Sequence, residues 1–113
     1  MQKEYRVKKH SEFDRIIHAG ARIKTIHYTI YIEKAPEQNH ARIGIAVSKR
    51  NGIAVSRVRI KRQIRAMISR NFDMNRRLNL IIVIRPNYSP LEKKGNEEEL
   101  AKALDEIKDH EIE

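Results

Sequence analysis

The spacing of hydrophobic residues near the start of the chain is helical. Phe13 and Ile16 stand three residues apart, and Gly20 follows as a stop. Ser11 and Asp14 form the pattern of a capping box, in which two side chains bind the first free amides of a helix. We therefore expect a helix of about two turns that begins near Ser11.

From residue 22 to residue 33 the pattern changes to a period of two, which is typical of a strand buried on one face. The face expected to be buried carries Ile26, Tyr28, Ile30 and Ile32. The other face carries Thr25, His27, Thr29 and Tyr31. A loop with Pro36 leads to a second predicted strand, 42–48, whose buried Ile43, Ile45 and Val47 alternate with Gly44, Ala46 and Ser48. Small residues beside Thr29 and Tyr31 leave room for a ligand on that face.

Asn51-Gly52 interrupts the second strand, and a helix is predicted from about Ala54 to Ser69. Its buried stripe is expected to contain Ile60, Ile64, Met67 and Ile68. The opposite side carries Arg59, Lys61, Arg62 and Arg65, with Val58 among them. The helix thus has one apolar and one cationic side.

The run 80–84 is apolar without alternation, which predicts a strand covered on both faces and ended by Pro86. Asn96 is expected to cap a last helix, with Glu97 to Glu99 near its positive end. Its apolar stripe is expected to hold Leu100, Leu104 and Ile107. The order is α-β-β-α-β-α, or α-β-β-β-α-β-α if residues 22–24 form a separate short strand. The fold class is therefore α+β.

The chain has 113 residues, which fits one domain over 1–113, and a formal net charge of +9. Cysteine is absent, which excludes disulfides, thiolate metal sites and cysteine nucleophiles. No apolar run reaches the roughly 18 residues of a membrane span, and the basic start has no apolar region behind it. We therefore expect a cytoplasmic protein without a membrane partner.

The charge is unevenly distributed. Residues 1–70 hold 17 basic and 5 acidic side chains, whereas residues 71–113 hold 7 basic and 10 acidic ones. No acidic residue occurs between Glu37 and Asp73. Because like charges repel, such a block indicates an anionic partner, and nucleic acid is the commonest one; an acidic protein or lipid is the lesser alternative.

Groups for protein-based catalysis are sparse. The five histidines are scattered, and no pair has the helical spacing of metal ligands. His10 and His27 could cleave RNA by acid–base catalysis only if the fold brought them together. The basic block has no carboxylate to hold Mg²⁺, and the glycines lack phosphate-loop spacing. The chain is therefore expected to have neither catalytic nor metal-binding residues of its own.

The segment 43–65, IGIAVSKRNGIAVSRVRIKRQIR, resembles the signature of the bacterial ribonuclease P protein subunit. In that family a strand ending in Ser-Lys-Lys leads through Gly-Asn-Ala-Val into an Arg-Asn-Arg helix. The resemblance extends to the basic run 5–9, the helix at Phe13, the strand with Tyr31 and the strand ending in Arg85-Pro86.

The resemblance implies an α/β sandwich with a left-handed β-α-β crossover, as in the second domain of ribosomal protein S5. It also implies a protein that binds the catalytic RNA and the 5′ leader of precursor tRNA, one protein to one RNA. Mg²⁺ would be bound mainly by the RNA, which performs the cleavage. By position, the RNA-subunit contacts would be Lys49, Arg50, Arg57, Arg59, Lys61, Arg62 and Arg65. The leader contacts would be Arg6, Lys9, Phe13 and Tyr31.

Three positions depart from the family pattern. Ile53 and Val58 stand where the family has asparagines, and Ile17 stands where an aromatic residue is common. Val58 can offer no hydrogen bond on the side of the helix assigned to RNA.

Three other functions remain open from the residues alone. A ribosomal or other structural RNA-binding protein would have a similar composition. A DNA-binding helix is less favoured, because 54–69 offers many cations but few neutral groups that read bases. The third alternative is a nuclease that uses its own histidines.

Overall fold

The structure is a computed structural model and describes residues 2–107. Its main elements are α1 (His10–Ile17), β1 (Ala21–Lys24), β2 (Tyr28–Lys34), β3 (Arg42–Val47), α2 (Ala54–Asn71), β4 (Leu78–Ile84) and α3 (Lys93–Asp105). Two 3-10 turns, η1 (Lys3–Tyr5) and η2 (Lys49–Asn51), precede α1 and α2. The longer of the two predicted orders is confirmed, with β1 as a separate short strand.

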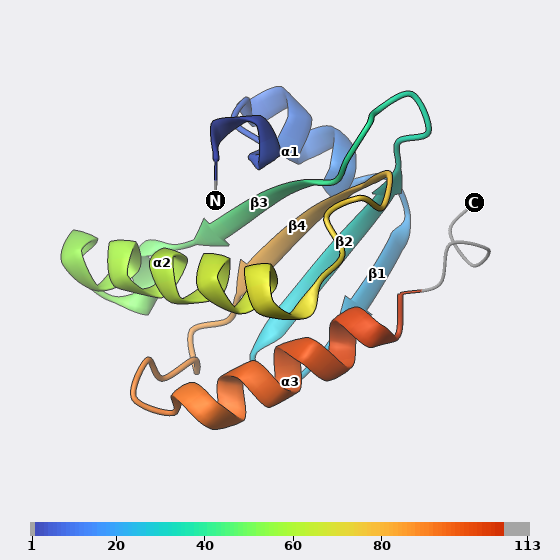
Figure 1. Cartoon of the computed structure of the whole chain (residues 1–113). Helices are drawn as coiled ribbons and strands as arrows, with labels where there is room; N and C mark the ends of the chain where they lie inside the picture. Colours follow the sequence, from blue (N-terminus) through green and yellow to red (C-terminus); the bar gives the residue numbers. More distant parts are fainter. Residues whose placement is uncertain (1, 108–113) are drawn as a thin grey trace.

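The four strands form one sheet in the order β1-β2-β4-β3. β2 pairs antiparallel with β1 and with β4, whereas β3 and β4 are parallel and are joined through α2. In Figure 1, α2 lies in front of the sheet, and the parallel strands β3 and β4 both run toward the lower left. If the picture is rotated until these two strands point upward, β4 lies to the left of β3. The crossover is therefore left-handed, as the resemblance implies and against the usual rule.

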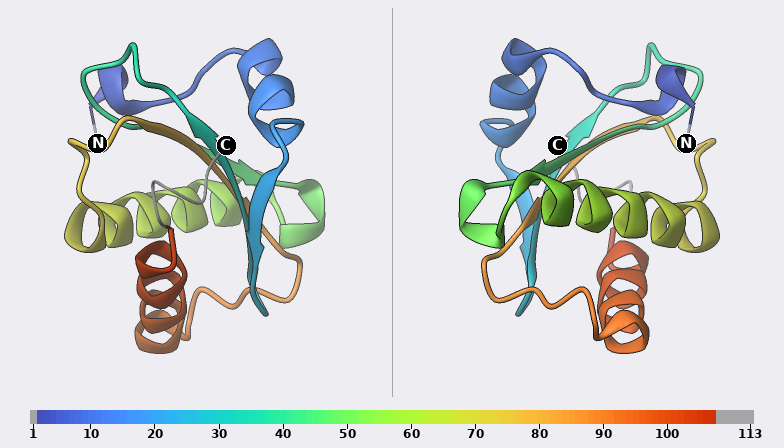
Figure 2. Two further views of the ribbon diagram at one scale, coloured as in Figure 1. Left: turned by 90° about the vertical axis from the view of Figure 1, so that its right-hand side faces the viewer. Right: turned by 90° about the vertical axis from the view of Figure 1, so that its left-hand side faces the viewer.

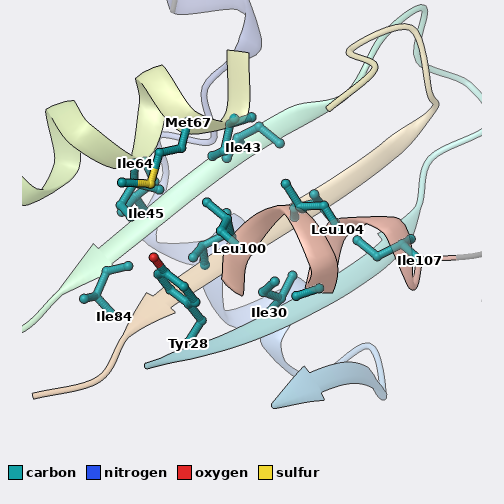
Figure 3. Close-up of a cluster of buried hydrophobic side chains, with 14 of the residues drawn as sticks. Tyr28, Ile30, Ile43, Ile45, Ile64, Met67, Ile84, Leu100, Leu104 and Ile107 are labelled. Atoms are coloured by element: carbon teal, nitrogen blue, oxygen red, sulfur yellow. The ribbon is translucent and has the colours of Figure 1, made fainter. Parts of the chain in front are cut away.

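The helices form two layers on opposite faces of the sheet. α2 and α3 cover one face, and α1 lies on the other (Figure 2). The larger core fills the α2–α3 side, where strand residues meet both helices (Figure 3). The predicted stripes are confirmed: Ile60, Ile64, Met67, Ile68, Leu100, Leu104 and Ile107 are all buried.

β4 is buried on both faces, as its unbroken apolar run predicts. Ile82 belongs to the core under α2 and α3, whereas Ile81 packs with Val7 and Ile16 on the α1 side. A strand in the middle of a three-layer arrangement has no face left for water, so the alternation of polar residues is lost.

One prediction about the first strand pair is wrong, the place of Ile26 in the core. The period-two run is broken at residues 25–27, where the backbone amide of Thr25 donates to the carbonyl of Tyr28 at 2.8 Å and closes a hairpin. Ile26 lies in this turn and is 69% exposed, so its predicted place in the core is wrong. The alternation of hydrophobic and polar residues continues through the turn although the backbone changes direction there.

Both predicted helix caps are wrong. α1 begins at His10, because the carbonyl of Lys9 already accepts the amides of Glu12 and Phe13, and no side chain caps it. α3 begins at Lys93, three residues before Asn96. Asn96 is instead buried within the helix, where its Nδ2 donates to the carbonyl of Ser89 at 2.7 Å.

Candidate nucleic-acid interface

Two ion pairs attach α1 to one end of the sheet face that it covers, the α1 face. Arg42 of β3 binds Glu12 of α1 at 2.6 Å, and Arg15 of α1 binds Glu33 of β2 at 3.0 Å. The guanidinium of Arg42, through its hydrogen bond, holds the pKa of the Glu12 carboxyl below its ordinary value. These two pairs fix α1 over the start of β3 and the end of β2.

The strand register places two further rows of side chains on the same face. Residues directly opposite one another in paired strands share a face of the sheet. The first row reads Gly44, Ile81, Tyr31 and Arg22 across β3, β4, β2 and β1. The second row reads Ala46, Val83, Thr29 and Lys24. α1 packs against the first row, and Val83 of the second row also packs against this cluster. The rest of the second row is partly or fully exposed, so this row forms the more open part of the face.

The ring of Phe13 lies on Gly44. A Cβ built on Gly44 would lie only 2.7 Å from Cζ of Phe13, which shows how closely the ring approaches the strand. Phe13 is half-buried and packs, with Tyr31, against the cluster around Ile16. Both aromatic residues of the predicted leader site thus have structural contacts and still border the open face.

The residues before α1, 2–9, form an N-terminal arm. A cationic groove of about 520 Å³ separates this arm from α2 at the edge of β3. Its walls are formed by Lys3, Arg6, Val7, Lys8, Phe13, Ile43, Ile45, Lys61 and Arg65, without an acidic residue. Burial, and then the charge of Arg6, lower the pKa of Arg65 below its ordinary value. Cations held close together attract an anion, because it lowers the repulsion between them.

A second hollow of about 470 Å³ continues this groove along the edge of β3, because Ile45 and Lys61 line both. It also contains Ala46 and Val83 of the open row. Its cations are Arg50, Lys61 and Arg85, and again no acidic residue lines it. The two hollows together connect the basic helix with the open sheet face.

The structure divides the predicted cationic side of α2 into two. Lys61 and Arg65 are partly buried and face the groove, whereas Arg59 and Arg62 are exposed. The exposed pair borders a separate shallow hollow of about 480 Å³ together with Ala54, Val55 and Val58. Val58 is 52% exposed there.

The remaining predicted contacts lie near the start of α2. Lys49 and Arg50 lie in η2, where the Oγ of Ser48 accepts a hydrogen bond from the amide of Arg50 at 3.3 Å. Gly52 then turns the chain with a φ of +112°, a conformation that favours glycine. Arg57 is partly buried, and its Nε has no hydrogen-bond partner within residues 2–107.

The structure joins residues that the sequence assigned to different partners. Arg6, from the predicted leader site, lies beside Arg65, from the predicted RNA-subunit site. Lys9 is exposed just before α1 and does not line this groove, whereas Lys8 does. The predicted contacts do not include Lys3, which lines the groove, or Arg85, which lines the hollow beside it. They also do not include Arg22 and Lys24, which the strand register places opposite Tyr31 and Thr29.

The two histidines considered for catalysis have separate partners on opposite sides of the sheet. His10 lies 3.6 Å from Asp14 within α1. His27 lies in the β1–β2 turn and contacts the carboxylate of Glu99 in α3 at 2.6 Å. Within residues 2–107 no three histidine, cysteine or acidic residues gather into a metal site, and no helix there has the length and hydropathy to span a bilayer.

Comparison with known proteins identifies the family. The family model described as Ribonuclease P matches residues 1–108. The chain belongs to the ribonuclease P protein family. The ribonuclease P protein component of Enterococcus faecalis is 36% identical over 99 residues, which cover 87% of this chain and 81% of the relative. That of Macrococcus caseolyticus is 38% identical over 85 residues, covering 75% and 74%.

Solved ribonuclease P proteins have the same fold. The Staphylococcus aureus protein superimposes with a TM-score of 0.77 at 30% identity, covering 89% of this chain and 93% of that one. The Thermotoga maritima protein is 19% identical and shows the fold alone, with a TM-score of 0.76 over 91% of this chain and 97% of the other. The predicted family and fold class are thereby confirmed.

Proposed function

We propose that this chain binds the catalytic RNA of ribonuclease P and the 5′ leader of precursor tRNA, and so assists Mg²⁺-dependent removal of the leader. One observation carries the proposal beyond family membership: the groove and hollow along β3 are continuous, cationic and free of acidic lining residues. They connect α2 with a sheet face that offers aromatic rings. Single-stranded RNA is bound by this combination, because rings stack on any base and cations follow the backbone.

The roles are divided by position. Arg59 and Arg62, on the exposed side of α2, would contact phosphates of the RNA subunit, together with Lys49, Arg50 and Arg57. Lys61 and Arg65 face the groove and would contact RNA at the junction of both partners. Phe13, Tyr31, Arg6 and Lys9 would contact the leader.

The chemistry of cleavage is assigned to the RNA subunit. The protein would bind as a monomer, one copy to one RNA, in the cytoplasm. Mg²⁺ fits the phosphate groups of the RNA better than this chain, whose described residues hold no cluster of three potential ligands. The cations of the protein reduce repulsion between RNA phosphates, so the complex should need less Mg²⁺.

The test is cleavage of precursor tRNA by a bacterial ribonuclease P RNA at low Mg²⁺, with and without the protein. We expect cleavage at lower Mg²⁺ with the protein and none with the protein alone. Lys61→Ala with Arg65→Ala should weaken RNA binding and reduce the slope of log K against log salt by about 1.5. The matched control removes two exposed cations of α3, Lys94→Ala with Lys102→Ala, and should leave the slope unchanged.

The same experiment separates the rival functions. A structural RNA-binding protein would bind RNA without preferring precursor over mature tRNA and would not lower the Mg²⁺ requirement. Cleavage by the purified protein, abolished by His10→Ala or His27→Ala, would show a protein-based nuclease instead. Either result would contradict the proposal.

A further inference from the structure

The β1 edge of the sheet carries two cations that the fold does not use. Arg22 lies opposite Tyr31, and Lys24 lies opposite Thr29, so both share the α1 face with these β2 residues. Both side chains are exposed, and neither has an ion-pair partner among residues 2–107. β1 is the edge strand opposite β3, so the two cations lie at the other edge of the sheet from the groove.

Other arginines near this face have a structural role. Arg15 and Arg42 are each neutralised by a glutamate and hold α1 in place. A charged residue on an edge strand also discourages pairing with another chain, but that role depends on exposure alone and on no particular neighbours. The position of Arg22 and Lys24 relative to the rest of the face is therefore informative.

Each cation ends a row of side chains that crosses the whole sheet. The open row passes from Ala46 through Val83 and Thr29 to Lys24. Val83 and Thr29 occupy its middle, while Lys61, Arg50 and Arg85 lie near its β3 end. Three strand spacings separate the two ends, about 14 Å, which a few nucleotides of extended RNA would cross.

We propose that Arg22 and Lys24 bind backbone phosphates of the leader after it has crossed the sheet past Tyr31. This inference rests on the proposed function and extends it: the leader would have a second cationic anchor on β1, several nucleotides farther from the cleavage site than the groove at β3. Bases lying over Val83 and Thr29 in the middle of the row, beside the ring of Tyr31, would place phosphates at both cationic ends.

The test uses holoenzymes assembled from the full chain and precursor tRNAs with leaders of increasing length. For the native protein, affinity should rise with leader length and then reach a plateau. For Arg22→Ala with Lys24→Ala, short leaders should bind as before, while the plateau should come a few nucleotides earlier. Long leaders should bind roughly five- to tenfold more weakly, and their salt slope should fall by about 1.4, because each single-strand phosphate contact contributes about 0.7.

Lys94→Ala with Lys102→Ala is again the matched control and should behave as the native protein at every length. Equal affinity of the double β1 variant for long leaders would overturn the inference, and so would a loss of the same size for short and long leaders. Absence of any length dependence in the native protein would contradict the leader-binding part of the proposed function itself. Thermal unfolding of the variant should match the native protein, since both side chains are exposed.

Discussion

Gly44 gives the sharpest test of how the aromatic site is built. A Cβ on Gly44 would lie 2.6 Å from Cδ1 of Ile81 and 2.7 Å from Cζ of Phe13, both closer than the 3.0 Å that real Cβ atoms essentially never cross. Ile81 of β4 is fully buried against Val7 and Ile16, whereas Phe13 is only half-buried. In Gly44→Ala we therefore expect the Phe13 ring to move outward.

The magnitude follows from two opposing contributions. Overpacking by one methyl group costs about 1–3 kcal/mol. Alanine in a strand recovers about 0.5–1 kcal/mol of the conformational entropy that glycine loses on folding. At the middle of both ranges the net loss is about 1.2 kcal/mol, which lowers the melting temperature of a domain of this size by about 5 °C.

Thermal unfolding followed by circular dichroism measures this loss. Ile81→Val removes the Cδ1 atom that would be contacted, so Gly44→Ala should cost less in that background than alone. The control is Gly95→Ala in α3, where nothing lies within 4 Å of the added Cβ; it should raise stability by about 0.5–1 kcal/mol. If Gly44→Ala also proved neutral or stabilising, the close packing of Phe13 on β3 would be refuted.

Two further predictions concern α3 and α2. Hydrogen bonds from Arg70 and Asn71 lower the pKa of Glu97 from its ordinary 4.5 to about 2. The stability that this carboxylate contributes is therefore complete above about pH 4.5 and is lost as the pH falls toward 2. Glu97→Gln should therefore lower the free energy of unfolding by about 1 kcal/mol at pH 7, after screening by solvent, and by little at pH 2. Chemical denaturation at both pH values measures this difference. An equal loss at both pH values would contradict the prediction. Val58→Asn should tighten binding to the ribonuclease P RNA, because valine leaves a facing RNA polar group unpaired, and it should leave the melting temperature nearly unchanged, since Val58 is 52% exposed. A clear fall in melting temperature without a gain in binding would refute that reasoning.

The buried parts of the fold could be predicted because hydrophobic periodicity reports burial directly. The stripe of α2 and the doubly covered β4 depend on residues within one element, and both were predicted correctly. The caps failed because a capping pattern is a local preference, and contacts outside the pattern decided where each helix starts. The side chain of Asn96, for example, donates to the carbonyl of Ser89 instead of capping the helix. The backbone carbonyl of Asn96 accepts a hydrogen bond from the hydroxyl of Tyr28 at 2.9 Å.

The candidate site could be predicted in composition but not in arrangement. A helical wheel identifies which side of α2 is cationic, yet it contains no information about the N-terminal arm. The bridge between Arg6 and Ile43, with the amide of Val7 donating to the carbonyl of Ile43 at 3.0 Å, brings that arm to the edge of β3, where Arg6 lies beside Arg65. Likewise, the alternation in 22–33 could not show a hairpin, and without the hairpin Arg22 and Lys24 cannot be placed beside β2.

The acidic residues explain why the interface keeps its charge. Glu12 and Glu33 neutralise the arginines that hold α1 on the sheet, and Glu97 joins α3 to Arg70 at the end of α2. Burial raises the pKa of the Glu99 carboxyl, but hydrogen bonds from His27 and Thr25 outweigh this effect, so the pKa lies below its ordinary value. These four carboxylates thus stabilise helix positions away from the groove, where none of them lines the walls. Because these four carboxylates are held in pairs elsewhere, none of them lies among the cations that line the groove, and an RNA backbone can approach those cations.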